Sequence, residues 1–378
     1  MLDDVLAFSD PLSVPQEALE KLTKPEEWWR DRQAWLAERG YMLRPRYRPG
    51  WTPSWKAHPD VFPWKFEDYH GASNPHLMDA VSIPDNQLVV LKKVLKSFNP
   101  LEVEVVQYLS SEALRSDPRN HTVPILEIFS VPDDPEATVL VMPLMRQCDD
   151  PAWQTVGEIV AFLTQVFEGL QFMHELHVAH SRDCVAQNIM YDPRRMYPHM
   201  FHPKDPDKSP DFKSKARHSN RTVCPVKYYF IDFGLSRRYN PEDGPPREHP
   251  IRGGDKSVPE FQSWKGDLVD PFPTDIYYVG NMIRTDILEK FEGVEFLAPL
   301  ADDMTATDPI QRPTIQEVVR RFDALLKPLD NPILRSRLLL RGQPEDWKTR
   351  WLRDFGHSLR SFGYALLRKS AIPLPPSS

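Results

Sequence analysis

Three oxygen-bearing side chains stand beside short apolar segments whose composition predicts strands. Asp183 and Asn188 lie five residues apart in a polar stretch that leads into Ile189–Tyr191. Asp232 ends a run of β-prone residues, and Gly234 then allows the backbone to turn sharply. Carboxylate and amide oxygens can hold Mg²⁺ against a triphosphate while a second carboxylate accepts a hydroxyl proton. The spacing therefore predicts phosphoryl transfer.

These two motifs resemble those of the eukaryotic protein kinases. Residues 182–188, with Arg-Asp followed after four residues by Asn, are similar to the catalytic loop, and residues 232–234 to the metal-binding Asp-Phe-Gly. The resemblance implies that Arg182 and Asp183 belong to the catalytic machinery, with Asp183 orienting or deprotonating the acceptor. It also implies that Asn188 and Asp232 hold Mg²⁺ and that ATP is the phosphoryl donor.

Three downstream segments resemble further kinase motifs in the same order. Residues 258–260 are similar to A-P-E, Asp275 begins a segment like D-x-W-x-x-G, and residues 308–314 closely resemble D-P-x-x-R-P-T. The resemblance implies that Asp275 is a buried anchor and that Arg312 pairs with Glu260, because a planar guanidinium can make two hydrogen bonds to one carboxylate. Small-molecule kinases of related fold generally lack the A-P-E and D-P-x-x-R-P elements, so a protein substrate is favoured.

The nucleotide contacts are expected upstream. The segment ending in Lys92 resembles the V-A-I-K strand, which implies that Lys92 contacts the α- and β-phosphates, although a lone strand lysine is ordinarily solvated. A helix expected at about 101–114 offers Glu102, Glu104 and Glu112 as ion-pair partners. We choose Glu104, because a carboxylate followed by apolar positions resembles the kinase pattern, with Glu112 in reserve.

Residues 139–145 have the composition of a buried strand and resemble the last small-lobe strand running into the kinase hinge. The resemblance implies that Met142 is the gatekeeper. It further implies that the carbonyl of Pro143 and the amide of Met145 hydrogen-bond adenine, and proline suits the first position because only its carbonyl is needed.

The chain departs from the kinase pattern in three places. Residues 69–78 contain a single glycine, Gly71, where kinases carry a G-x-G-x-x-G loop over the phosphates. Ser181 separates the His and the Arg of the catalytic loop, and Val185 replaces the usual lysine. The rival hypothesis is thus a pseudokinase that binds partners without turnover. For an active enzyme we expect a serine or threonine acceptor more than tyrosine.

The expected fold is α+β and two-lobed, with a small antiparallel-sheet lobe and a larger, mainly helical lobe. Strands are predicted at 77–83 and 87–94, a helix along the apolar stripe of 159–173, and a hairpin from 188–191 and 226–232. The predicted divisions are an N-terminal extension (1–70), a small lobe (71–145), a large lobe (146–330) with an inserted loop (192–227), and a C-terminal amphipathic tail (331–378).

Four segments outside the motifs have alternative interpretations. A capping box at Thr23 predicts a helix over 24–39. The Pro-, Arg- and Trp-rich stretch 44–55 is expected to pack as a strap rather than to stack on nucleic-acid bases. The basic loop 202–221 is either a solvated, mobile loop or a docking surface for an acidic partner. The tail's aromatic and basic residues at 347–366 favour packing on the large lobe over lying on an anionic membrane.

The composition of the chain indicates the broad class of protein to which it belongs. The 378 residues carry a formal net charge of -7, which argues against a dedicated nucleic-acid binder. The three cysteines are expected to be reduced thiols of an intracellular protein, and no apolar run is long enough for a transmembrane segment. Residues 178–184, 188–192 and 227–237 look most like the divergent kinase-like proteins of basidiomycete fungi.

Overall fold

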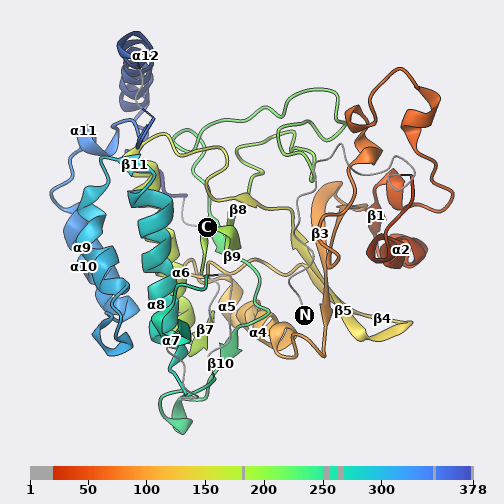
Figure 1. The fold of residues 1–378 in the computed structure, drawn as a ribbon, viewed down its shortest axis with the longest axis horizontal. Coiled ribbons are helices and arrows are strands. Elements are labelled where there is room, and N and C mark those ends of the chain that lie inside the picture. Colours follow the sequence, from red (N-terminus) through yellow and green to blue (C-terminus); the bar gives the residue numbers. More distant parts are fainter. Residues whose placement is uncertain (1–19, 181–183, 250–254, 263–267, 344–345, 376–378) are drawn as a thin grey trace.

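The protein has an α+β fold in which a five-stranded antiparallel sheet stands beside a mainly helical region (Figure 1). The computed structural model describes residues 20–180, 184–249, 255–262, 268–343 and 346–375. The strand order of the sheet is β1-β2-β3-β5-β4. Its strands are β1 (Tyr41–Leu43), β2 (Leu77–Ser82), β3 (Gln87–Leu95), β4 (Glu127–Val131) and β5 (Asp134–Pro143).

The two strands predicted at 77–83 and 87–94 are confirmed as the hairpin of β2 and β3. Asn86 takes a positive φ of 55° in the turn between them, a conformation that asparagine tolerates better than most residues. In the register of the sheet, Lys92 of β3 lies between Leu77 of β2 and Leu140 of β5. A central strand with neighbours on both sides thus fixes the position of Lys92.

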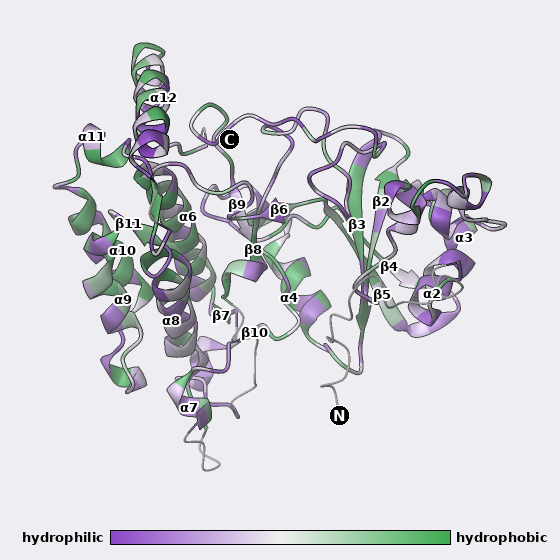
Figure 2. Ribbon diagram, turned by 45° about the horizontal axis from the view of Figure 1, so that its top comes forward, coloured by the Kyte–Doolittle hydropathy of each residue, from purple (hydrophilic) through white to green (hydrophobic). Residues whose placement is uncertain are grey.

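The helical region is built around the long helix α6, most of whose residues are apolar and buried. Thr155 caps this helix by accepting a hydrogen bond from the amide of Glu158. Figure 2 shows the many hydrophobic residues of α6 in green. Two helices lie between β3 and β4, namely α4 (Glu102–Leu109) and α5 (Glu112–Arg115). The helices after β5 are α6 (Val156–Glu175), α7 (Pro259–Gln262), α8 (Pro271–Met282), α9 (Ala298–Met304), α10 (Ile315–Leu326), α11 (Asn331–Leu334) and α12 (Trp347–Leu366).

Short strands connect the two regions. The predicted hairpin of 188–191 and 226–232 is confirmed as the antiparallel pair β8 and β9, with Ile189 opposite Phe230. A third strand, β6, follows β5 closely along the chain and pairs with β8. The short strands are β6 (Arg146–Gln147), β7 (Val178–Ala179), β8 (Ile189–Tyr191), β9 (Tyr228–Phe230), β10 (Arg237–Arg238), β11 (Phe291–Glu292) and β12 (Leu339–Leu340).

The N-terminal segment belongs to the core of the sheet, so the boundary expected at residue 70 does not separate them. Instead of one helix over 24–39, two helices form, α2 (Lys24–Asp31) and α3 (Gln33–Glu38), with a break at Arg32. Trp29 and Leu36 are fully buried in one cluster with residues of β1, β2, β3 and β5. The sheet needs this cover because its second face would otherwise expose apolar side chains.

Residues 44–76 connect β1 to β2 through short 3₁₀ turns, and their first part packs as the predicted strap. The indole nitrogen of Trp51 donates a hydrogen bond of 2.9 Å to Asp68, and Trp55 is buried. These turns are Pro45–Tyr47, Ser54–Ala57, Pro63–Lys65 and Glu67–Tyr69.

The loop 202–221 of the inserted segment is anchored at its two ends, and the residues between them are partly or fully exposed, so its mobility stays a prediction. His202 is buried, and its Nε2 lies 3.0 Å from Oε1 of Glu67 in the β1–β2 connection. The guanidinium of Arg221 is also buried and donates to the carbonyl of Cys148 at 2.8 Å. These contacts come from polar side chains, which the apolar content of the sequence does not report.

The tail forms the expected amphipathic helix, but the prediction that its apolar residues pack on the helical region is wrong. Residues of α12 are all described, and none is buried. In Figure 1, α12 extends away from the other helices. No helix in the described part of the chain is long and apolar enough to cross a membrane.

Candidate functional site

Lys92 is the centre of an ion triad that joins three segments of the chain. Its Nζ lies 2.5 Å from Oε1 of Glu102 and 2.7 Å from Oδ1 of Asp232. Lys92 comes from β3, Glu102 begins α4, and Asp232 follows β9. Two of the sequence-predicted site residues, Lys92 and Asp232, are therefore in direct contact.

The prediction that Glu104 is the ion-pair partner of Lys92 is wrong. Glu102 is 1% exposed and makes the ion pair, whereas Glu104 and the reserve Glu112 are exposed. Positions two apart on a helix point in very different directions, so only one of Glu102 and Glu104 can face the sheet. The sequence held a signal for Glu102, because it shares one helix face with Val105, Val106 and Leu109 at steps of three and four residues.

The electrostatics of the triad follow from burial and from the proximity of its charges. Burial alone would raise the pKa of Asp232, but the ammonium of Lys92 overcomes this effect and lowers the pKa below its ordinary value. Burial raises the pKa of Glu102, and Lys92 only partly offsets that change. For Lys92, burial would lower the pKa, yet the two carboxylates outweigh it and raise the pKa. The cation is thus held in its charged form.

Asn188 and Asp232, the predicted metal ligands, lie at the same end of the β8–β9 hairpin. The amide of Ile231 donates a hydrogen bond of 2.9 Å to the carbonyl of Asn188. Asp232 has a positive φ of 59°, a conformation that is uncommon outside glycine and is found at functional sites. Its side chain remains 48% exposed even though it contacts Lys92. The hairpin therefore places the backbones of Asn188 and Asp232 near each other.

This donor set fits Mg²⁺ bound together with phosphate oxygens. The carboxylate of Asp232 and the amide oxygen of Asn188 are hard ligands of the kind that Mg²⁺ prefers, and Mg²⁺ is commonly held by one or two protein groups plus substrate. Among the described residues, no group of three or more His, Cys, Asp or Glu side chains could hold a metal ion by itself. Arg182 and Asp183 lie outside the described residues.

Asp275 holds the segment that ends at His180 through hydrogen bonds of its carboxylate. It is fully buried in α8, and its Oδ2 accepts a hydrogen bond of 2.9 Å from the amide of His180. The same oxygen lies 3.1 Å from Nε2 of His174. The ring of His180 contacts Phe233 and lies with its Nε2 3.1 Å from the carbonyl of Ile231. The carboxylate of Asp275 thus links α8 to His180, and the ring of His180 in turn contacts the segment that carries Asp232.

Arg312 and Glu260 form the bidentate pair that the resemblance implies. Nη1 and Nη2 of Arg312 donate to the two carboxylate oxygens at 2.7 and 2.6 Å. The remaining donors of the guanidinium bind the carbonyls of Ala306 and Pro273. Both side chains of the pair are buried, so α7 is fastened to the segment that leads into α10.

The expected adenine contacts lie at the end of β5. Met142 is partly buried and pairs with Val90 of β3, two residues before Lys92. Pro143 pairs with Val89, and Met145 is buried just beyond the strand. Met142 and Pro143 therefore lie on the strand next to the one that carries Lys92, and Met145 follows two residues after the end of that strand.

Gly71, the single glycine of residues 69–78, is used for packing. A Cβ atom at this position would lie 2.6 Å from Oε1 of Glu26, far inside contact distance. Glu26 is buried and paired with Arg46 at 3.1 Å, and it also accepts a hydrogen bond from the amide of Ala72. Gly71 thus lets the β1–β2 connection approach the N-terminal segment closely.

Comparison with known proteins adds no relative to this description. The sequence matches no protein-family model, and a search of curated proteins finds no significant match. The interpretation of the site therefore depends on its own residues, namely the triad of Lys92, Glu102 and Asp232, the adjacent Asn188, and the pair of Arg312 and Glu260.

Proposed function

We propose that the protein is an ATP-dependent protein kinase of two-lobed architecture, which transfers the γ-phosphate of ATP to a protein hydroxyl, serine or threonine more than tyrosine. The observation that carries this proposal is that one lysine of β3, Lys92, contacts both Glu102 and Asp232. A buried cation held between two carboxylates, one of them half exposed beside Asn188, is suited to neutralising the charge of phosphate groups.

Each residue has a defined part in this proposal. Lys92 binds the α- and β-phosphates, and Glu102 keeps its ammonium in position. Asn188 and Asp232 hold Mg²⁺, which when bound neutralises charge on the phosphate oxygens. Met142, Pro143 and Met145 receive the adenine. Asp183, by the resemblance alone, orients the acceptor hydroxyl or takes its proton.

The pair of Arg312 and Glu260 favours a protein substrate over a small molecule. It fastens α7, which contains Glu260, to the segment that leads into α10. In the protein kinases that the sequence resembles, the A-P-E motif ends the activation segment, and small-molecule kinases generally lack both motifs. The buried bidentate pair is therefore a support for protein phosphorylation.

A pseudokinase that binds partners without turnover is the second candidate, and Gly71 favours it. Because Gly71 packs against Glu26, it does not provide the bare backbone that covers phosphates in a glycine-rich loop. Losing such a loop weakens the positioning of the nucleotide, whereas the charged groups required for transfer are retained. We therefore give the triad, which favours an active kinase, more weight than Gly71, which favours a pseudokinase.

Nucleotide binding separates these candidates from an unrelated function. We expect MgATP to raise the melting temperature of the wild-type chain by several degrees at saturating concentration, because a ligand that binds only the native state stabilises it. The variant Asp232→Asn should lose most of this shift, and the exposed control Asp302→Asn should keep it. No shift for wild type would contradict both nucleotide-binding proposals, and a shift without phosphate transfer would favour the pseudokinase.

A further inference from the structure

Helix α12 presents an apolar face to solvent. Six aromatic or aliphatic side chains recur along it at steps of three and four residues, which places them on one side of the helix. Their exposed fractions lie between 53% and 75%, although residues of these types are usually buried. These six residues, here called the outer face, are Trp347, Trp351, Phe355, Leu359, Phe362 and Leu366.

The opposite side of α12 attaches the helix to the rest of the protein through polar contacts. Nε2 of His357 lies 2.6 Å from the carbonyl of Arg335, and Asp354 forms an ion pair of 2.9 Å with Arg337. The hydroxyl of Tyr364 accepts a hydrogen bond of 2.6 Å from Asn220 in the inserted segment. The arrangement is therefore the inverse of a packed amphipathic helix, with polar residues inward and apolar residues outward.

The chain is also held beyond the end of α12. Arg335 donates a hydrogen bond of 2.5 Å to the carbonyl of Lys369, and Ala371 is buried beside Gly157 of α6. Contacts within the helix and after it thus set the orientation of the outer face. An exposed apolar face of fixed orientation marks a surface that another body covers.

The charge of α12 indicates which kind of surface covers the outer face. The helix carries Lys348, Arg350, Arg353 and Arg360 against Asp354, a net charge of 4 − 1 = +3, while the whole chain has a formal net charge of -7. Pairing α12 with α12 of a second copy would bring two basic helices together, which is unfavourable. A surface that is both anionic and apolar complements the helix instead.

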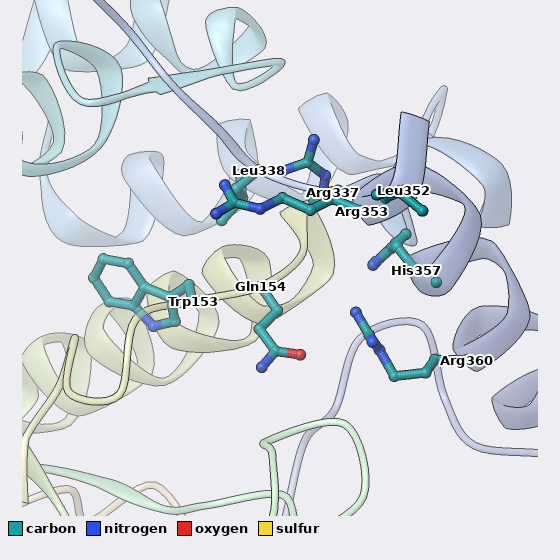
Figure 3. A pocket seen from close by; sticks show the side chains of 9 residues that line it. Trp153, Gln154, Arg337, Leu338, Leu352, Arg353, His357 and Arg360 are labelled. Atoms are coloured by element: carbon teal, nitrogen blue, oxygen red, sulfur yellow. The ribbon is translucent and has the colours of Figure 1, made fainter. Parts of the chain in front are cut away.

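The side-chain types and the neighbouring cavity narrow the choice to a lipid surface. Tryptophan and phenylalanine on one face with arginine and lysine on the other side are typical of helices that lie in a membrane interface. A cavity of about 630 Å³ lies between α12 and Trp153, and Figure 3 shows Arg337, Arg353, His357 and Arg360 around it. These cationic groups lie on the inward side of α12, so they add positive charge next to the helix without belonging to the outer face.

We propose that α12 binds the protein to the surface of anionic lipid bilayers. The outer face enters the boundary between headgroups and acyl chains, and the exposed Lys348 and Arg350 contact the phosphate groups. The helix lies along the surface without crossing it, since its charges exclude it from the hydrocarbon core. This inference is independent of the proposed kinase activity, because it rests on residues that lie outside the ion triad.

Co-sedimentation of the full chain with lipid vesicles tests the proposal. We expect binding to vesicles of phosphatidylcholine mixed with phosphatidylserine and at least tenfold weaker binding to phosphatidylcholine alone. The double variant Trp351→Ser/Phe355→Ser should bind anionic vesicles at least tenfold more weakly. The matched control Phe62→Ser/Trp64→Ser removes a stacked aromatic pair that is exposed elsewhere, and it should bind like wild type.

A charge variant and a folding control complete the design. Lys348→Gln/Arg350→Gln should weaken binding to anionic vesicles by about 25-fold, because each cation near such a surface contributes about fivefold. Thermal unfolding of the α12 variants should match wild type, since no residue of this fully described helix is buried. The proposal is overturned if wild type does not bind anionic vesicles, or if the Trp351/Phe355 variant binds as well as its control. It is equally overturned if the chain dimerises in sedimentation velocity and these two substitutions abolish the dimer.

Discussion

Lys92 and Asp232 are 140 residues apart in the chain, yet Nζ of the lysine lies 2.7 Å from Oδ1 of the aspartate. Their contact joins the five-stranded sheet to the hairpin of β8 and β9. Glu102 completes the connection from α4. The geometry of this contact, with Asn188 alongside, is the basis of the proposed phosphoryl transfer.

The assignment of Glu102 as the partner of Lys92 predicts different effects for two neighbouring glutamates. Glu102→Gln should destabilise the fold by about 1–3 kcal/mol, because it removes a charged hydrogen-bond partner from a buried group. It should also slow phosphate transfer if the chain is an active kinase. Glu104→Gln should change stability by less than about 0.5 kcal/mol, since Glu104 is exposed. Urea unfolding of both variants measures the difference, and equal effects would contradict the assignment.

The pair of Arg312 and Glu260 predicts that lysine cannot replace this arginine. Arg312→Lys should destabilise the protein by about 2–4 kcal/mol, because a lysine cannot make the two parallel hydrogen bonds and leaves buried carbonyl and carboxylate groups without donors. Arg320 makes a similar pair with Glu317, but this pair is exposed. Arg320→Lys is therefore the matched control and should leave the urea midpoint unchanged. An unchanged midpoint for Arg312→Lys would show that the buried pair is dispensable.

The contact between the inserted segment and the β1–β2 connection predicts a pH-dependent contribution to stability. Burial alone would raise the pKa of Glu67, but His202 and Arg44 overcome it and lower the pKa to about 2. Because the folded-state pKa lies below the unfolded value, the stabilisation is present above about pH 4.5 and is lost as pH falls toward 2. At neutral pH the ionised carboxylate of Glu67 should contribute about 2–3 kcal/mol to the free energy of unfolding.

The variant Glu67→Gln measures this contribution. The difference in unfolding free energy between wild type and Glu67→Gln should be large at pH 7 and should shrink steadily as pH is lowered through 4 and 3. Urea unfolding at each pH provides the values, provided that wild type remains folded. A difference that is constant with pH would show that the carboxylate charge of Glu67 is not the stabilising group.

The packing of Gly71 predicts that even one added methyl group is harmful. Gly71→Ala should cost about 1–3 kcal/mol, because the new Cβ meets Glu26, whose ion pair with Arg46 prevents it from moving away. Gly363 of α12 has open space around it. Gly363→Ala should therefore be neutral or stabilise the helix by up to about 1 kcal/mol. Thermal unfolding compares the two, and a neutral Gly71→Ala would mean that the connection can yield.

Much of the site could be predicted from the sequence because its residues stand at the ends of apolar segments. The segments before Lys92 and Asp232 become β3 and β9, and Asn188 immediately precedes β8. Strand composition and motif order therefore located all three residues. The error at Glu104 arose where two glutamates alternate in one helix turn, and only the spacing of Val105, Val106 and Leu109 distinguishes them.

Other features depended on contacts that a linear pattern does not report. Pairing of β1 with β2 across the connection 44–76 brings Trp29 and Leu36 into the sheet core, beyond the boundary expected at residue 70. His202 and Arg221 anchor the inserted segment through polar contacts rather than apolar ones. For α12, amphipathic spacing predicted the helix, but spacing is the same whether the apolar face meets the protein or another surface.

Transfer of radiolabelled phosphate from MgATP tests the central proposal most directly. The wild-type chain, incubated alone and with a mixed peptide library, should incorporate label into protein hydroxyls, mainly serine and threonine. Asp232→Asn and Asp183→Asn should each lower the rate by at least about 100-fold, because they remove a metal ligand and the residue that orients the acceptor. The exposed control Asp302→Asn should retain the wild-type rate. Absence of incorporation by wild type, or incorporation that both active-site substitutions leave unchanged, would contradict the assignment of this site to phosphoryl transfer.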